Sequence, residues 1–130
     1  MNAPKTQSSQ EYSSPELPGR VTVEPLVLET IARLTTRNIE GVARIAQKTD
    51  VERFLGIGHK PVEVHVEEGQ VAVDVHLLAN PGLSLLRLGR RVQEEVTNAI
   101  QQMVGMRVQA VNVYIEDVLH PELEMAQDEA

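Results

Sequence analysis

The chain has 130 residues, a formal net charge of −7 and a pI near 5.0, with 42% hydrophobic and 24% charged residues. This length fits one small globular domain and is too short for two full ones. Because the chain has no cysteine, disulfide frameworks, thiolate nucleophiles and Cys-ligated metal centres are excluded. The acidic balance also gives little unspecific attraction to nucleic acid or anionic lipid.

Composition divides the chain into three segments. Residues 1–18 contain three prolines and four serines with scattered apolar residues, which predicts a disordered N-terminal arm. Residues 19–118 are expected to fold, and residues 119–130, with a net charge of −4, are expected to form an acidic, disordered tail. Neither a secretory signal nor an apolar run of about 18 residues is present, so we expect a cytoplasmic protein without direct membrane insertion.

The first expected elements are a strand and a helix. Residues 19–23 alternate as a short strand, and Pro25 suits the first position of a helix that should end near Asn38 or Gly41. Its apolar stripe is expected to include Leu26, Val27, Ile31 and Leu34. Residues 42–54 are ambiguous and could hold a short second helical piece, and residues 56–61 form a glycine-rich loop.

Alternating valines give the strongest structural signal. They run along residues 62–66 and 71–77 and are separated by the turn Glu68-Gly69, which predicts a β-hairpin. A two-residue turn pairs residue 66 with 71, 64 with 73 and 62 with 75, and so places the valines on one face. The opposite face is expected to meet water with these residues: Glu63, His65, Glu67, Ala72, Asp74 and His76.

A long helix and a last strand complete the predicted fold. Ser84 can cap a helix that Gly105 ends, and residues 111–115 alternate as a strand. The expected apolar stripe of this helix is Leu85, Leu88, Val92, Val96, Ala99, Ile100 and Met103. The order β-α-β-β-α-β predicts a small α+β sandwich with two helices on one face of a mainly antiparallel sheet, in ferredoxin-like order.

Histidine chemistry is the first functional candidate. In the predicted register His65 and His76 lie about 13 Å apart at ~3.3 Å per residue, so they cannot share a zinc ion. His65 can form a carboxylate–imidazole cluster with Glu63 and Asp74, for which a solvated sheet face is favoured over a hydrolase or isomerase site. No phosphate-binding glycine motif is present, and we predict neither catalytic residues nor a cofactor or metal.

The same element order occurs in the RNA recognition motif, which stacks bases on aromatic residues of an open sheet. Here only Tyr114 lies on the presumed open face, among carboxylates that repel phosphate, and no G-x-x-G spacing is present. Nucleic-acid binding is therefore disfavoured.

The start of the long helix is the best candidate for a protein contact. Leu83 and Leu86 add more leucine than one core stripe can bury, although partial core packing is the alternative. Three arginines lie where the helix dipole disfavours cations, although Arg90–Glu94 and Arg91–Glu95 pairs on a solvated face are the simpler interpretation. The candidate protein-interaction residues are Leu83, Leu86, Arg87, Arg90, Arg91 and Tyr114.

Three stretches within residues 19–118 carry a family resemblance: GRVTVEPLVLETIARLTTRNIEGVARI, VEVHVEEGQVAVDVHLL and GRRVQEEVTNAIQQMVGMRVQAVNVYIEDV. The chain resembles the bacterial alkaline shock proteins, also described as envelope stress response proteins. Its departures from the pattern are residues 47–60, Glu68 in the hairpin turn, and the leucine-rich residues 80–89.

This resemblance implies a cytoplasmic, non-enzymatic scaffold or adaptor in the envelope stress response. It further implies self-association into a homo-oligomer and recruitment near the membrane by a membrane-anchored partner protein. Some relatives are linked to control of fatty-acid synthesis, so a regulatory binding module for a soluble enzyme is the alternative. The resemblance offers no catalytic motif to transfer.

Overall fold

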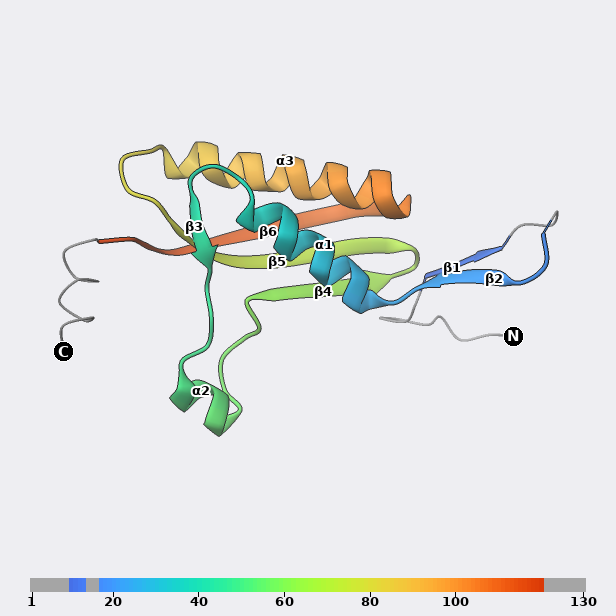
Figure 1. Cartoon of the computed structure of the whole chain (residues 1–130), viewed down its shortest axis with the longest axis horizontal. Coiled ribbons are helices and arrows are strands. Elements are labelled where there is room, and N and C mark those ends of the chain that lie inside the picture. Colours follow the sequence, from blue (N-terminus) through green and yellow to red (C-terminus); the bar gives the residue numbers. More distant parts are fainter. Residues whose placement is uncertain (1–9, 14–16, 121–130) are drawn as a thin grey trace.

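The main sheet is built around one long strand, β5 (Gln70–Ala79), in a computed structural model that describes residues 10–13 and 17–120. β6 (Arg107–Val118) pairs parallel along the whole of β5. β4 (Val62–Glu67) pairs antiparallel with the first half of β5, and β3 (Val42–Ile45) pairs antiparallel with its end. Because β6 occupies one edge of β5, β3 and β4 follow each other along the opposite edge (Figure 1).

The hairpin prediction is confirmed residue by residue. Val66 pairs with Val71, Val64 with Val73 and Val62 with Val75. The valine face is the core side of the sheet, where Val71, Val73 and Val75 are fully buried. The predicted α+β class is also confirmed, while the direct parallel pairing of β5 with β6 is a feature that element order had left open.

Both long helices cover this valine face. α1 (Pro25–Arg37) and α3 (Leu85–Val104) pack on each other, α1 also lies against β3 and β4, and α3 lies along β6 (Figure 1). Ser84 caps α3 and Gly105 ends it in a left-handed conformation, as predicted. The helices bury the following residues: Leu28, Ile31, Ala32 and Thr36 from α1, and Leu88, Val92, Val96, Ile100 and Val104 from α3.

The predicted apolar stripes need correction at their borders. In α1 the exposed positions include Leu26, Val27 and Leu34, because the helix turns Leu28 and Ala32 toward the sheet instead. In α3 the stripe predicted that Met103 would be buried, but Met103 is exposed and its neighbour Val104 is buried instead. Leu85 at the first turn is also exposed.

The N-terminal strands form a second, separate sheet. β2 (Arg20–Val23) coincides with the predicted first strand, but it pairs antiparallel with β1 (Gln10–Ser13) and not with the main sheet. A strand at Gln10–Ser13 was not expected, since these residues fall in the segment predicted to be disordered. The remaining predictions of disorder for residues 1–9, 14–16 and 121–130 lie outside the described residues.

Residues 47–61 leave the sheet between β3 and β4 as a protruding segment, the α2 arm. It carries the short helix α2 (Asp50–Leu55), which fulfils the expected helical piece and buries none of its residues (Figure 1). Thr49 caps it: its hydroxyl accepts a hydrogen bond from the Glu52 backbone N–H at 3.1 Å, and the Glu52 carboxylate accepts one from the Thr49 N–H at 3.1 Å. Local capping, and not packing, therefore holds α2 together.

The order of α2 is expected to depend on pH. The hydrogen bonds from Thr49 lower the pKa of Glu52 below its ordinary value. Their contribution is therefore complete above the pKa of Glu52 in the unfolded chain, and it is lost as the pH falls through the lower pKa of the folded chain. Amide hydrogen exchange across Asp50–Leu55 should speed up relative to the core strands under acid conditions. In Thr49→Ala the exchange should already be fast near neutral pH, with no further relative change on acidification.

Candidate functional site

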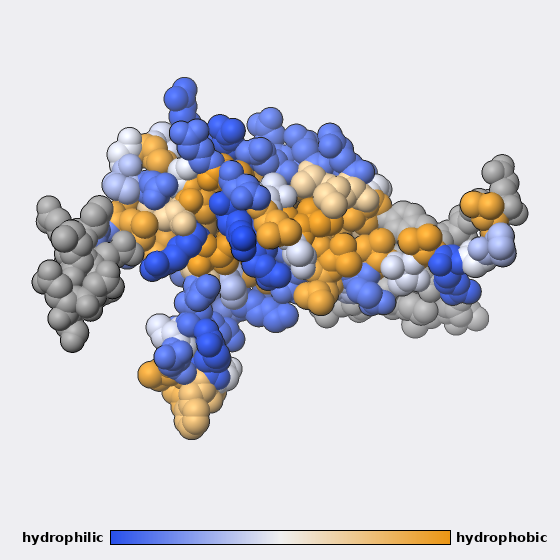
Figure 2. Space-filling model, viewed as in Figure 1, coloured by the Kyte–Doolittle hydropathy of each residue, from blue (hydrophilic) through white to orange (hydrophobic). Residues whose placement is uncertain are grey.

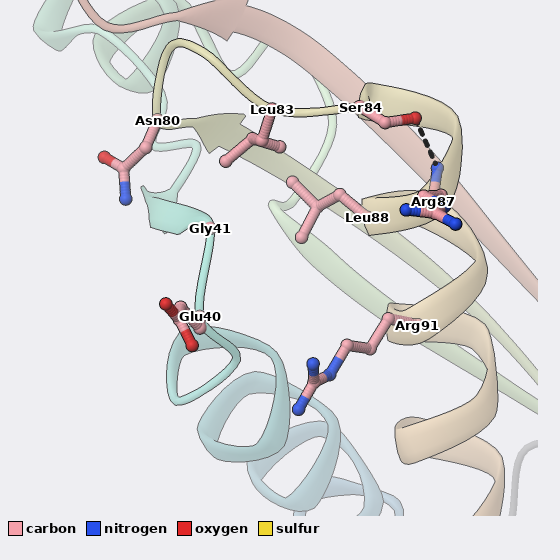
Figure 3. Close-up of a pocket in the computed structure, with 8 residues that line it drawn as sticks. All are labelled: Glu40, Gly41, Asn80, Leu83, Ser84, Arg87, Leu88 and Arg91. Atoms are coloured by element: carbon pink, nitrogen blue, oxygen red, sulfur yellow. Dashed lines mark hydrogen bonds between the residues drawn. The ribbon is translucent and has the colours of Figure 1, made fainter.

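A cavity of about 420 Å³ opens where the turn from α1 to β3, the loop from β5 to α3 and the start of α3 meet (Figure 3). Its lining residues are Glu40, Gly41, Asn80, Leu83, Ser84, Arg87, Leu88 and Arg91. Three of the predicted interaction residues, Leu83, Arg87 and Arg91, therefore meet in one place. We call this cavity the arginine pocket.

Backbone geometry fixes the walls of the arginine pocket. The Asn80 N–H donates to the Gly41 carbonyl at 2.8 Å, which joins the two loops. Gly41 has a φ of +104°, and a Cβ atom there would lie 3.2 Å from side-chain carbons of both Leu83 and Leu88. On the other wall, the Ser84 hydroxyl accepts a hydrogen bond from the Arg87 N–H at 3.3 Å. The pocket shape thus depends on a glycine at position 41.

The charge in the arginine pocket is mixed. Arg91 reaches toward the wall that carries Glu40 (Figure 3), and its Nε donates to the Glu95 carboxylate at 3.0 Å, which raises the pKa of Arg91. This confirms the predicted Arg91–Glu95 pair. No ion pair of the Arg87 guanidinium is found within the described part of the chain, so a second carboxylate could bind beside it.

Leu86 and Arg90 do not line the arginine pocket, but together with Arg87 and Arg91 they line a second hollow of about 660 Å³ along α3. With 71% of its surface exposed, Leu86 borders a shallow groove of about 360 Å³ between α3 and β6, the α3–β6 groove. Arg90 donates to the Gln93 side chain at 3.0 Å in place of the expected pair with Glu94. The groove is lined by Leu85, Leu86, Gly89, Arg90, Gln93, Val113 and Ile115.

Tyr114 lies on the opposite, helix-free face of the sheet, as expected, but there it packs against a histidine. Its ring stacks on His76 with centroids 4.5 Å apart, and His76 Nδ1 lies 2.6 Å from the Glu116 carboxylate. The prediction that His76 meets water is therefore wrong: the ring pairs with Glu116, and the residue is only 7% exposed.

The predicted cluster around His65 does form. Its Nε2 lies 3.6 Å from carboxylate oxygens of both Glu63 and Asp74, and all three side chains are partly exposed. Asp74 also accepts a hydrogen bond from Asn112 at 2.8 Å. The cluster has the geometry of a solvated polar face, and Glu63 and Asp74 also line an open cavity of about 580 Å³ that His65 does not line.

The tip of the α2 arm exposes an apolar surface that the sequence patterns did not single out (Figure 2). Its residues are Val51, Phe54, Leu55 and Ile57, here called the α2 knob, with Phe54 89% exposed. A helix of six residues is too short for a periodic stripe to separate core from surface. The available signal was a capped start at Thr49 followed by more apolar residues than such a helix can bury.

These features define a small α+β domain with an exposed apolar surface on the α2 arm and mixed charge around the arginine pocket. In the described residues, no helix has the length and apolar character needed to cross a membrane.

Residues 13–120 match the model of the alkaline shock protein family, described as having a cell envelope-related function, and the chain belongs to this family. The match confirms the resemblance given above and assigns the chain a cell envelope-related role.

Two relatives match this chain over most of their length and of its own. The uncharacterized protein YqhY of Bacillus subtilis (strain 168) is 28% identical over 101 residues, which are 75% of each chain. The uncharacterized protein Spy1535 of Streptococcus pyogenes serotype M6 is 28% identical over 104 residues, 78% of this chain and 80% of that one. No solved structure shows a significant match.

Proposed function

We propose that this protein is a non-enzymatic scaffold or adaptor of the cell envelope. It self-associates on the cytoplasmic side and is held near the membrane by a membrane-anchored partner protein. The observation that supports this most is the α2 knob: three large apolar side chains of a helix with no buried residue, and Ile57 just after it, are exposed to water. Such a surface is stabilised when another molecule covers it.

A second copy of the chain has a surface that suits the α2 knob. The α3–β6 groove is mostly apolar, and its rim carries Arg90, while the helix that bears the knob has a net negative charge from Asp50 and Glu52 against Arg53. Apolar surfaces therefore meet with opposite charges beside them. The knob and the groove are different surfaces, so an assembly of copies always keeps one unoccupied knob and one unoccupied groove at its two ends. Further copies can therefore bind there.

The test is the mass of the full chain in solution, measured by light scattering over a range of concentrations. Wild type should form assemblies, whereas Phe54→Asp and Leu86→Asp should each reduce the mass to that of a monomer. The matched control is Met103→Asp, which changes an exposed apolar residue on α3 outside both surfaces and should leave the mass unchanged. A monomeric wild type, or full-size assemblies of Phe54→Asp, would contradict the proposal.

Recruitment to the membrane is tested separately, by a tagged pull-down from membrane and soluble extracts. A small membrane protein should be recovered from the membrane extract.

The alternative, a regulatory module for a soluble enzyme, is favoured by one observation: Arg87 lines the arginine pocket with no ion pair among the described residues. It predicts recovery of an enzyme from membrane-free extract. That recovery should be lost in the double variant Arg87→Glu, Arg91→Glu and kept in Phe54→Asp.

A further inference from the structure

The helix-free face of the sheet holds a second group of polar residues, at the point where the α2 arm rejoins the sheet. β3 and β4 meet at His76: the Ala46 N–H donates to the His76 carbonyl, and the His76 N–H donates to the Pro61 carbonyl. His59 lies just before Pro61, at the base of the arm. Its ring stacks on His76 with centroids 4.6 Å apart and an angle of 20°.

The third member, Glu116, lies at a β-bulge on the same face of the sheet. In the pairing of β5 with β6, Leu77 lies opposite Ile115 but Leu78 lies opposite Asp117, so Glu116 is an extra residue. Glu116 follows Tyr114 by two residues, so the alternation of the strand places both side chains on the helix-free face. The Glu116 carboxylate reaches His76 Nδ1 at 2.6 Å, beside Tyr114, which covers the other face of the ring.

We propose that His59, His76 and Glu116 form a binding site for a divalent transition-metal ion, with zinc as the ion of choice. One donor atom from each residue lies within 4.8 Å of the other two. Zinc is commonly bound by imidazole nitrogens together with a carboxylate. Magnesium and calcium prefer oxygen ligands, so the two imidazoles make them poor candidates for this site.

A rotation of the His59 ring separates this arrangement from a metal site, because two stacked, nearly parallel imidazoles cannot both point a nitrogen lone pair at one ion. Two ligands of one zinc ion lie roughly 3–4 Å apart when each bond is about 2.0–2.2 Å. Exposed His59, on the loop of the α2 arm, has room to close the remaining distance. The ion takes the place of the proton between His76 Nδ1 and the Glu116 carboxylate, and that proton leaves to solvent.

The surroundings leave room for a fourth ligand. A cavity of about 580 Å³ borders the site, and its lining includes Glu63 from β4 and Asp74 from β5. Water or one of these carboxylates can complete a tetrahedral shell. The bound ion would connect the α2 arm to β5 and β6 through side chains, which the capping of α2 alone does not do.

The experiment titrates zinc into the untagged full chain, freed of metal by a chelator, with calorimetric detection. Wild type should bind one equivalent, and its melting temperature should rise with zinc. His59→Ala and His76→Ala should each weaken binding at least about tenfold, and Glu116→Gln should weaken it about 10- to 100-fold. The matched control is His65→Ala, which removes the histidine of the other cluster on the same face and should keep wild-type affinity.

His76 is buried, so His76→Ala could lose stability for other reasons. His59 is exposed, and His59→Ala should retain the melting temperature of the metal-free protein while losing the zinc-dependent rise. The proposal is overturned if wild type binds zinc no better than the double variant His59→Ala, His76→Ala, or if His65→Ala abolishes the binding. Neither result bears on the knob–groove contact, because the readout is metal binding and not mass.

Discussion

Replacing Gly41 with alanine is expected to lower the free energy of unfolding by about 2–3 kcal/mol, whereas Gly89→Ala should raise it by about 1 kcal/mol. Gly41 has a φ of +104°, outside the range that a residue with a Cβ adopts readily, and the added carbon would lie 3.2 Å from Leu83 and Leu88. Gly89 lies inside α3 with nothing within 4 Å of an added Cβ, so alanine there only restores helix propensity.

Urea denaturation of both variants measures the two effects in one fold. The pair controls for the general consequence of adding a methyl group, since only the backbone angle and the neighbours differ between the sites. Equal midpoints for Gly41→Ala and wild type would show that the turn relaxes freely. The walls of the arginine pocket would then not depend on the glycine.

How far the fold could be predicted depends on how local its signals are. The hairpin was predicted to the residue, because two-residue periodicity and a two-residue turn together leave one register that buries the valines. β3 was missed because four residues give too short a pattern, and its pairing with the end of β5 is a long-range contact. Nothing in residues 20–23 indicated that they would pair with Gln10–Ser13 in a separate sheet, while β3 joins the main sheet.

The candidate sites divide in the same way. Leu83, Arg87 and Arg91 line one pocket because they lie just before and at the start of one helix, and their role as an interaction site stays a prediction. The wall that Gly41 supplies comes from a different loop, so its position beside the start of α3 could be known only from the folded structure. His59 could not be linked to His76 from sequence, because residues 47–61 leave the sheet and return beside it, where Glu116 of β6 also lies.

The second large effect is expected in α3, where Ile100→Ala should cost about 2–5 kcal/mol of unfolding free energy and Met103→Ala less than about 0.5 kcal/mol. The two residues belong to the same predicted apolar stripe, yet Ile100 is 0% exposed and Met103 is 70% exposed. Removing the Ile100 side chain leaves a cavity among closely packed residues, whereas water already surrounds Met103.

Chemical denaturation at several protein concentrations distinguishes burial within one chain from burial between chains. The loss at Ile100 should be independent of concentration, because its neighbours belong to the same core. If Met103→Ala is as destabilising as Ile100→Ala at every concentration, the assignment of Val104 as the buried residue of this turn is wrong. A loss at Met103 that grows with concentration would instead place this end of α3 in a contact between copies, and the knob–groove contact would not be the only one.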